Sequence, residues 1–344
     1  MSDLSPKERL WRVLEKKTVD RPPVLCTGGM MNAAVVGVLE RTGPLLPAAH
    51  HDEGRMADLA LAVRQDTGFE NLGIPFCLTV EAEVLGSEID FGTLACEPKI
   101  AREVFPSVRQ VRFRDIGVLE KSGRIATVVQ AGYRLSRQEP DWPVIANLTG
   151  PISTAASIVD PMTFLKELRK DPENAHRVLD YVSDFLIAYA RLLIEGGATV
   201  IAIGDPTATG EILGPKVFAE YAVPYLNKIV AAVHDAGRPA IVHICGDIKA
   251  VRHLAAQLRS DALSTDALVN LRALKEEYPA LTTMGNLSTY LLQSGSPASV
   301  AAQTLRLVRD GIDIISPACG LSTSSSLAAI QAMTATVKES RRDG

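Results

Sequence analysis

Residues 240–246 read Ala-Ile-Val-His-Ile-Cys-Gly, a short run that begins apolar and ends in polar and small residues. Seven other stretches have the same design, and helical patterns fit between them. They are residues 23–28, 72–77, 144–151, 200–206, 262–266, 281–288 and 312–320. Runs that are apolar on both faces are typical of strands in a parallel sheet covered by helices. The chain therefore has eight candidate parallel strands.

Eight strands alternating with helices predict a (β/α)₈ TIM barrel in the α/β class, formed as one domain over residues 1–344. An N-terminal helix over residues 6–17 precedes the first strand and is expected to close the barrel floor. Residues 80–141 do not show the regular alternation of strand and helix patterns that is expected of a barrel. Alternating stretches at 108–113 and 125–129, with a turn at 121–123, predict a β-hairpin insertion after strand 2.

A doubly wound open sheet is the alternative fold. It would need a glycine-rich phosphate loop after the first strand. Cys26-Thr-Gly-Gly-Met30 lacks the G-x-G-x-x-G spacing, and the sequence contains no G-x-x-x-x-G-K-[ST] motif. These residues favour the barrel.

The composition narrows the class of protein. Lys and Arg number 36 against 40 Asp and Glu, which gives a formal charge of −4, and no basic run is present. Nucleic acid is therefore not an expected partner. The five cysteines are odd in number and widely spaced, which does not make a disulfide framework. The N-terminus lacks the apolar core of a signal peptide, and no apolar stretch is long enough to span a membrane. We expect a reduced, cytoplasmic protein without a membrane partner.

The chemistry is expected at the carboxyl ends of the strands, where barrel active sites lie. His243 and Cys245 are two residues apart on one strand and therefore point to the same side. Cys319 ends the last strand and can meet them only across the barrel mouth. One imidazole and two thiolates form a soft donor set that prefers zinc, and three protein ligands leave a position for substrate. The alternative is that His243 and Cys245 bind no metal and simply pack in the core of the protein.

Other polar residues at strand ends are weaker candidates. Asp266 ends the sixth strand and is a candidate fourth, oxygen ligand, although an N-cap role for the next helix fits equally well. Further mouth residues could act as substrate-binding or catalytic groups, or could serve only the loop backbone. These are the acids Glu81 and Asp205 and the neutral residues Asn147, Asn286 and Ser316.

Together with the barrel, His243-Ile-Cys245-Gly-Asp and Ser316-Pro-Ala-Cys319-Gly-Leu resemble the uroporphyrinogen decarboxylase superfamily. Within it, the chain is most similar to the zinc-dependent methylcobamide:coenzyme M methyltransferase branch. The resemblance covers nearly the whole chain. It includes Asp20-Arg-Pro-Pro-Val, Pro47-Ala-Ala-His-His-Asp, the stretch 75–86, Asn147-Leu-Thr-Gly-Pro, Asp205-Pro and Met284-Gly-Asn-Leu.

The resemblance implies that His243, Cys245 and Cys319 bind Zn²⁺, and that the metal binds a thiol acceptor. The decarboxylases carry an arginine-rich stretch after the first strand, whereas residues 27–34 here contain no arginine. The expected function is therefore methyl transfer from a methylated corrinoid (a methylcobamide), carried by a separate corrinoid protein, to a small thiol such as coenzyme M. The alternatives are a corrinoid methyltransferase with another acceptor (tetrahydrofolate or another thiol), a uroporphyrinogen decarboxylase-like enzyme, and a non-catalytic corrinoid-binding barrel.

Overall fold

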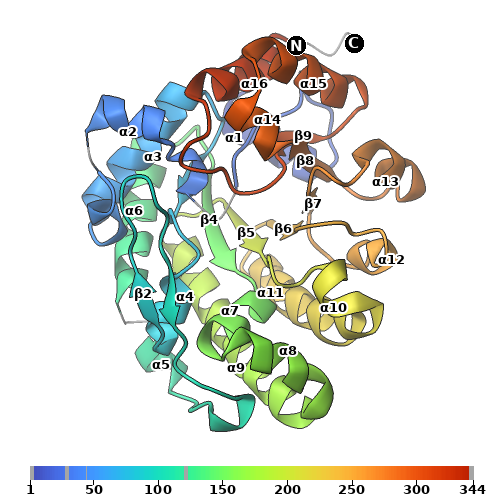
Figure 1. The fold of residues 1–344 in the computed structure, drawn as a ribbon. Helices are drawn as coiled ribbons and strands as arrows, with labels where there is room; N and C mark the ends of the chain where they lie inside the picture. The colour runs from blue at the N-terminus through green and yellow to red at the C-terminus, as the bar shows by residue number, and fades with distance from the viewer. Residues whose placement is uncertain (1–3, 28–30, 44, 120–122, 341–344) are drawn as a thin grey trace.

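A curled, seven-stranded parallel sheet forms the centre of the computed structural model (Figure 1). The structure describes residues 4–27, 31–43, 45–119 and 123–340. The strand order is β1-β4-β5-β6-β7-β8-β9, and each neighbouring pair is parallel. The strands are β1 (Leu72–Ile74), β4 (Val144–Thr149), β5 (Val200–Gly204), β6 (Ala240–Ile244), β7 (Ala262–Thr265), β8 (Thr283–Leu287) and β9 (Ile314–Pro317). Each lies within one of the eight predicted runs.

The first predicted run closes the sheet without forming a regular strand. Val24 makes an isolated parallel bridge to Ile315 in β9. On the other side, the Val24 carbonyl accepts a hydrogen bond of 2.8 Å from the backbone N–H of Glu70, just before β1. The Asn71 side chain bonds both backbone groups of Cys26, at 2.9 Å each. This segment therefore occupies the eighth strand position, and the predicted (β/α)₈ barrel is confirmed.

Helices surround the sheet, as expected for parallel strands buried on both faces. Those following the strands are α7 (Pro151–Ile158), α8 (Pro161–Lys170), α9 (Pro172–Glu195), α10 (Gly210–Val217), α11 (Val223–Asp235), α12 (Arg252–Ala255), α13 (Leu271–Glu277), α14 (Thr289–Ser294), α15 (Pro297–Arg309) and α16 (Leu327–Glu339). Before β1 lie α1 (Pro6–Leu14), α2 (Val36–Thr42) and α3 (Glu53–Thr67), and between β1 and β4 lie α4 (Val80–Leu85), α5 (Ile116–Leu119) and α6 (Arg124–Gln138). The described residues also form short 3₁₀ turns at Met31–Ala33, Ala48–His50 and Val108–Gln110 and a π-helical turn at Phe218–Ala222.

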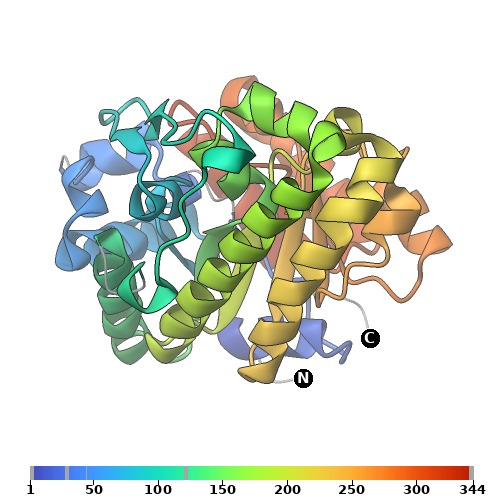
Figure 2. The same cartoon turned by 90° about the horizontal axis from the view of Figure 1, so that it is seen from below.

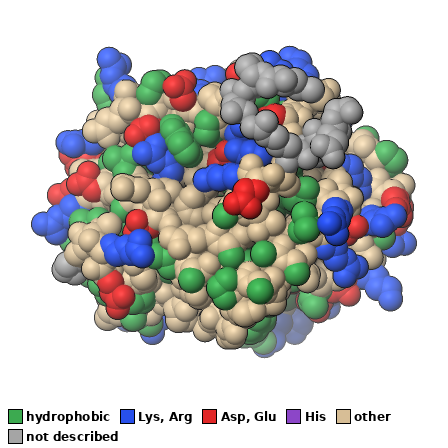
Figure 3. Space-filling view, turned by 90° about the horizontal axis from the view of Figure 1, so that it is seen from above, with side chains coloured by type: hydrophobic (Ala, Val, Ile, Leu, Met, Phe, Trp, Pro, Cys, Tyr) green, Lys and Arg blue, Asp and Glu red, His purple; other side chains and the backbone are tan. Residues whose placement is uncertain are grey.

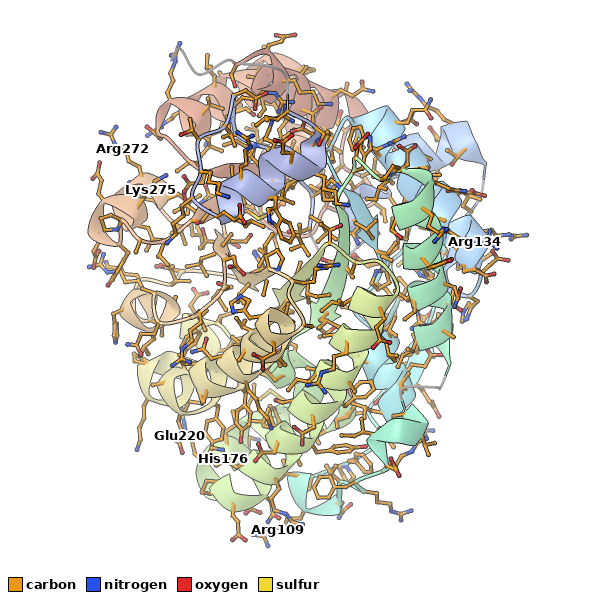
Figure 4. All side chains as sticks on the ribbon, turned by 180° about the vertical axis from the view of Figure 1, so that it is seen from behind. Arg109, Arg134, His176, Glu220, Arg272 and Lys275 are labelled. Atoms are coloured by element: carbon orange, nitrogen blue, oxygen red, sulfur yellow. The ribbon has the colours of Figure 1, made fainter. Side chains whose placement is uncertain are left out.

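The interior of the barrel is apolar at its floor. Leu10, Val13 and Leu14 of α1 pack in one cluster with inward-facing strand residues. These strand residues are Leu25, Ile145, Val200, Ala202, Ile241, Ala262, Met284 and Ile314. Figure 4 shows α1 crossing the barrel from behind, and Figure 2 shows it at the edge opposite the mouth. The predicted N-terminal helix therefore does close the floor, although it ends at Leu14.

The inner face of each strand continues from the floor toward the mouth of the barrel. Because side chains two residues apart share a face, the inner position above Ile241 is His243, and that above Ala262 is Ser264. The same step places Asn147, Asn286 and Ser316 on the inner face. The barrel interior therefore has an apolar layer at the floor and a layer of mostly polar side chains two residues further along the strands.

The insertion contains a hairpin, but not the strands expected from the sequence. The antiparallel pair is β2 (Glu88–Asp90) with β3 (Lys99–Arg102). Residues 108–110 form a 3₁₀ turn, and residues 125–129 belong to α6, so the prediction of strands there was wrong. Ile125, Val128 and Leu135 of α6 are all buried, and their spacing is that of one helical face. Most of the predicted turn at 121–123 lies outside the described residues.

The hairpin lies at the mouth end of the barrel, opposite α1 (Figure 2). Its tip contacts the loop that follows β9, where the Thr323 hydroxyl donates to the Ala95 carbonyl at 2.8 Å. On the face shown in Figure 3, basic and acidic side chains are interspersed. Among the described residues, no helix has the length and apolar character required to cross a membrane.

Candidate metal centre

His243, Cys245 and Cys319 come together at the barrel mouth. Their ligand atoms all lie within 4.8 Å of one another, and among the described residues they form the one His/Cys/Asp/Glu group with metal-binding geometry. His243 Nε2 lies 3.1 Å from Cys245 Sγ, and the two sulfurs are 3.7 Å apart. His243 is in β6, Cys245 follows it directly, and Cys319 lies two residues beyond β9. The predicted meeting of opposite strands across the mouth therefore occurs.

The spacing fits a tetrahedral zinc ion. With Zn–S bonds of about 2.3 Å, a tetrahedral site separates two sulfur ligands by about 3.8 Å. The observed separation of the Cys245 and Cys319 sulfurs is 3.7 Å. All three side chains are half-buried, so one side of the group remains open. A donor set of one imidazole and two sulfurs with an open position is typical of catalytic rather than structural zinc.

The two thiols share their proton unequally. The hydrogen bond between the two sulfurs, together with the neighbouring His243, lowers the pKa of Cys319. The same bond and burial raise the pKa of Cys245. The contact between the two sulfurs therefore favours negative charge on Cys319 over Cys245. Because metals bind the thiolate form of cysteine, this lowered pKa favours metal binding by Cys319.

A cavity of about 110 Å³ opens above this group. His243, Cys245 and Cys319 line it together with seven other residues of the described chain. These are Thr27, Leu78, Gly204, Pro206, Ser264, Pro317 and Gly320. None of these ten residues carries a cationic side chain. The cavity is thus mostly apolar, with the sulfurs and the imidazole as its reactive groups.

Asp266 lies beside the metal group but outside the set of three. One carboxylate oxygen accepts from the Gly246 N–H at 3.4 Å, next to Cys245, and the other from the Leu268 N–H at 3.1 Å. Its charge contributes to the raised pKa of Cys245. Asn286, on β8, fastens the same loop, since its amide donates to the carbonyls of Asp266 at 2.7 Å and Val269 at 2.8 Å.

Glu81 and Asn147 lie near the ends of β1 and β4, away from the cavity lining. The Glu81 carboxylate accepts from the backbone N–H of Thr149 at 2.8 Å and from its hydroxyl at 3.0 Å. Burial raises the pKa of Glu81 to about 7. The Asn147 amide donates to Asn32 Oδ1 and to the Ile74 carbonyl, both at 3.1 Å. Asn147 therefore joins β4 to the end of β1, and Glu81 joins the first turn of α4 to the end of β4.

Asp205 and Ser316 are likewise fully buried. The Asp205 carboxylate accepts from the backbone N–H groups of Ile152 at 3.0 Å and Ser153 at 2.8 Å, in the first turn of α7. The Ser153 hydroxyl adds a third bond of 2.6 Å. Burial nevertheless raises the pKa of Asp205 to about 6. The Ser316 hydroxyl donates to the carbonyl of Pro317 at 3.0 Å, in the segment that precedes Cys319.

Two features at the mouth were not singled out from the sequence. Ser264 lies 2.9 Å from His243 Nδ1, on the side of the ring opposite the sulfurs. Cys77 accepts a hydrogen bond of 3.2 Å from the buried guanidinium of Arg124, which also pairs with Glu83. The inward alternation 262, 264 could have identified Ser264. No local pattern joins Arg124 to Cys77, because 47 positions separate them.

His176, by contrast, lies at the periphery of the molecule with Glu220 (Figure 4). Its ring is 2.9 Å from the Tyr225 hydroxyl. This histidine is therefore accounted for by contacts between α9 and α11.

The fold and the mouth group together define a (β/α)₈-barrel protein with a histidine–cysteine centre at its mouth. The family model for uroporphyrinogen decarboxylase (URO-D) matches residues 5–340, and the chain belongs to this family.

Two relatives and one solved structure are similar to this chain over nearly its full length, and a further relative is similar over part of it. The methylcobamide:CoM methyltransferase MtbA of Methanosarcina acetivorans is 32% identical, over 97% of each chain. The methylcobamide:CoM methyltransferase MtaA of Methanosarcina barkeri is 29% identical, over 97% of this chain and 98% of its own. A uroporphyrinogen decarboxylase of Myxococcus xanthus is 27% identical over 68% of each chain. The solved structure of a methyltransferase from Methanosarcina mazei superposes with a TM-score of 0.91 at 28% identity, over 98% of this chain and 99% of that one.

Proposed function

We propose that the chain transfers a methyl group from a methylated corrinoid, carried by a separate corrinoid protein, to the thiol of coenzyme M or a similar small thiol, at a zinc centre. The observation that carries the proposal is the meeting of His243, Cys245 and Cys319 at the mouth, with 3.7 Å between the sulfurs. The names of full-length relatives support the reaction, since two are methylcobamide:CoM methyltransferases.

In this proposal His243 Nε2 and the sulfurs of Cys245 and Cys319 hold the ion, and the cavity side remains for the acceptor sulfur. Bound zinc would lower the pKa of the acceptor thiol, which is near 8.5 in water, so that the thiol reacts as its thiolate. Asp266, adjacent to Cys245 through Gly246, is proposed as the oxygen donor for the fourth position when no acceptor is bound.

The transfer is a nucleophilic displacement at the methyl carbon. The acceptor thiol releases its proton to water on binding, and its sulfur then forms a bond to the methyl carbon. The carbon–cobalt bond breaks, and its electron pair stays with the corrinoid, so Co(III) becomes Co(I). Thr27, Leu78, Pro206 and Pro317 line the approach with mostly apolar groups, which keeps water away from the attacking sulfur.

The size of the cavity supports the assignment of partners. A space of about 110 Å³ accommodates a small thiol but not a corrinoid ring. The corrinoid therefore presents its methyl group from outside the mouth, which is where a carrier protein would dock. The lining also favours methyl transfer over porphyrinogen decarboxylation. A substrate with several carboxylates would require cationic partners, and none of the ten lining residues is cationic.

The test combines metal analysis with a methyl-transfer assay. Protein purified with its thiols reduced should contain about one zinc per chain and should consume coenzyme M and methylcobalamin together, with the formation of Co(I) followed by absorbance. The Cys319→Ala variant should lose both properties. Cys96→Ser is the matched control, because Cys96 is exposed and lies on the hairpin tip. A zinc content below about 0.2 per chain would overturn the metal site. Full zinc occupancy without methylation of coenzyme M or of any thiol in a panel would overturn the reaction.

A further inference from the structure

We propose that Ser264 is a positioning residue of the metal centre. Its hydroxyl oxygen accepts the Nδ1–H of His243 and thereby turns Nε2 toward the two sulfurs. This inference rests on the proposed zinc site and names a residue that supports one of its ligands.

The register of the sheet places the two side chains together. His243 of β6 and Ser264 of β7 are paired in a parallel ladder, so their side chains point to the same face. That face is the barrel interior, because Ile241 and Ala262, two residues earlier on each strand, belong to the inner apolar cluster. Ser264 is 3% exposed, and its hydroxyl lies 2.9 Å from His243 Nδ1.

The two ring nitrogens of His243 have separate partners. Nδ1 is 2.9 Å from Ser264 Oγ, and Nε2 is 3.1 Å from Cys245 Sγ. A neutral imidazole carries one N–H and one lone pair. If Nδ1 donates to Ser264, the lone pair is at Nε2, where the sulfurs are. If Nδ1 accepted instead, Nε2 would carry the proton and could not bind a metal. Metal binding and the His243–Ser264 bond are therefore linked.

A serine suits this position because it fixes the ring without adding charge. Two thiolates already neutralise a divalent ion, and a carboxylate partner would add a further negative charge to the centre. The neutral hydroxyl orients the imidazole while leaving the charge of the site unchanged. Partners of this kind on metal-binding histidines change metal affinity by about 10–100-fold when they are removed.

The test is zinc affinity, measured by competition with a chromophoric chelator. Ser264→Ala should weaken zinc binding by about 10–100-fold. Ser264→Thr, which keeps the hydroxyl, should restore most of the affinity. Thr265→Val is the matched control. Thr265 is the next residue of β7 and is 0% exposed, and its Oγ1 has no hydrogen-bond partner among the described residues. This variant should bind zinc as the wild type does.

Equal affinity of Ser264→Ala and the wild type would overturn the inference, as would an equal loss in Thr265→Val, which would indicate a general packing effect. A second measurement needs no variant. In zinc-loaded protein with ¹⁵N-labelled histidine, the His243 ring should show a protonated Nδ1 and a metal-bound Nε2. Metal binding through Nδ1 would refute the proposal. Failure of the wild type to bind zinc would instead refute the proposed metal centre itself, so the two failures are distinguishable.

Discussion

Glu81 should make the stability of this protein depend on pH in the neutral range. Its carboxyl group is 2% exposed, and burial raises its pKa from 4.5 to about 7. Because the folded state binds this proton more tightly than the unfolded chain, the contribution of Glu81 is fully present below pH 4.5. It is lost as the pH rises through 7. A shift of this size corresponds to about 3.4 kcal/mol, at 1.36 kcal/mol per pH unit. The pKa of about 7 already includes the opposing effect of the two hydrogen bonds that Thr149 donates to the carboxylate.

The perturbation is Glu81→Gln, which keeps an oxygen to accept the Thr149 N–H but cannot ionise. Urea unfolding of both proteins at several pH values from 5 to 8 gives the free energy of unfolding. The wild type should lose about 2.5 kcal/mol over this range through Glu81, and the variant should lack that component. Glu173→Gln, at an exposed position of α9, is the control and should keep the wild-type slope. If Glu81→Gln keeps the full pH dependence of the wild type, the assignment to Glu81 is refuted.

Four further substitutions test the framework of the fold by urea unfolding. Gly150→Ala should destabilise the protein by about 1–3 kcal/mol, because its Cβ would lie 2.5 Å from Asp205 Cβ; unchanged stability would mean that the α7 start can move aside. Glu70→Gln should cost about 3–5 kcal/mol, since this buried carboxylate pairs with two guanidinium groups at 2.8 and 2.6 Å. Glu8→Gln, from an exposed pair, should cost less than about 1 kcal/mol, and equal losses would contradict the difference in burial. Leu10→Ala, at a position 0% exposed on the barrel floor, should cost about 2–5 kcal/mol.

The barrel was predictable because each strand is signalled locally, by a short apolar run between helical patterns. The meeting of Cys319 with His243 and Cys245 followed from one further rule, that parallel strand ends share one edge of a barrel. The insertion was not predictable in the same way. Residues 125–129 alternate like a strand over five positions, and only the longer spacing through Leu135 identifies the helix. The true hairpin strands have three and four residues and are largely exposed, so they carry little apolar signal.

The roles of the weaker candidates depend on contacts that a sequence does not display. Asp205 bonds the start of α7, Glu81 bonds Thr149, and Asn286 bonds the loop of Asp266. These bonds join residues that lie between 17 and 68 positions apart. Residue type and a place at a strand end could indicate that these groups are polar and buried. They could not indicate whether the partner is substrate or backbone.

These bonds explain how the three candidate ligands keep their spacing although they come from opposite sides of the barrel. Cys245 and Cys319 both lie beyond the last paired residues of their strands, where loop position decides the distance between the sulfurs. Asn286 lies on β8, between the strand that precedes Asp266 and the strand that precedes Cys319. Its two donated bonds hold the Asp266 loop, whose carboxylate bonds Gly246 next to Cys245. Substitution of Asn286 should therefore displace the candidate ligands, so that zinc affinity and activity fall together.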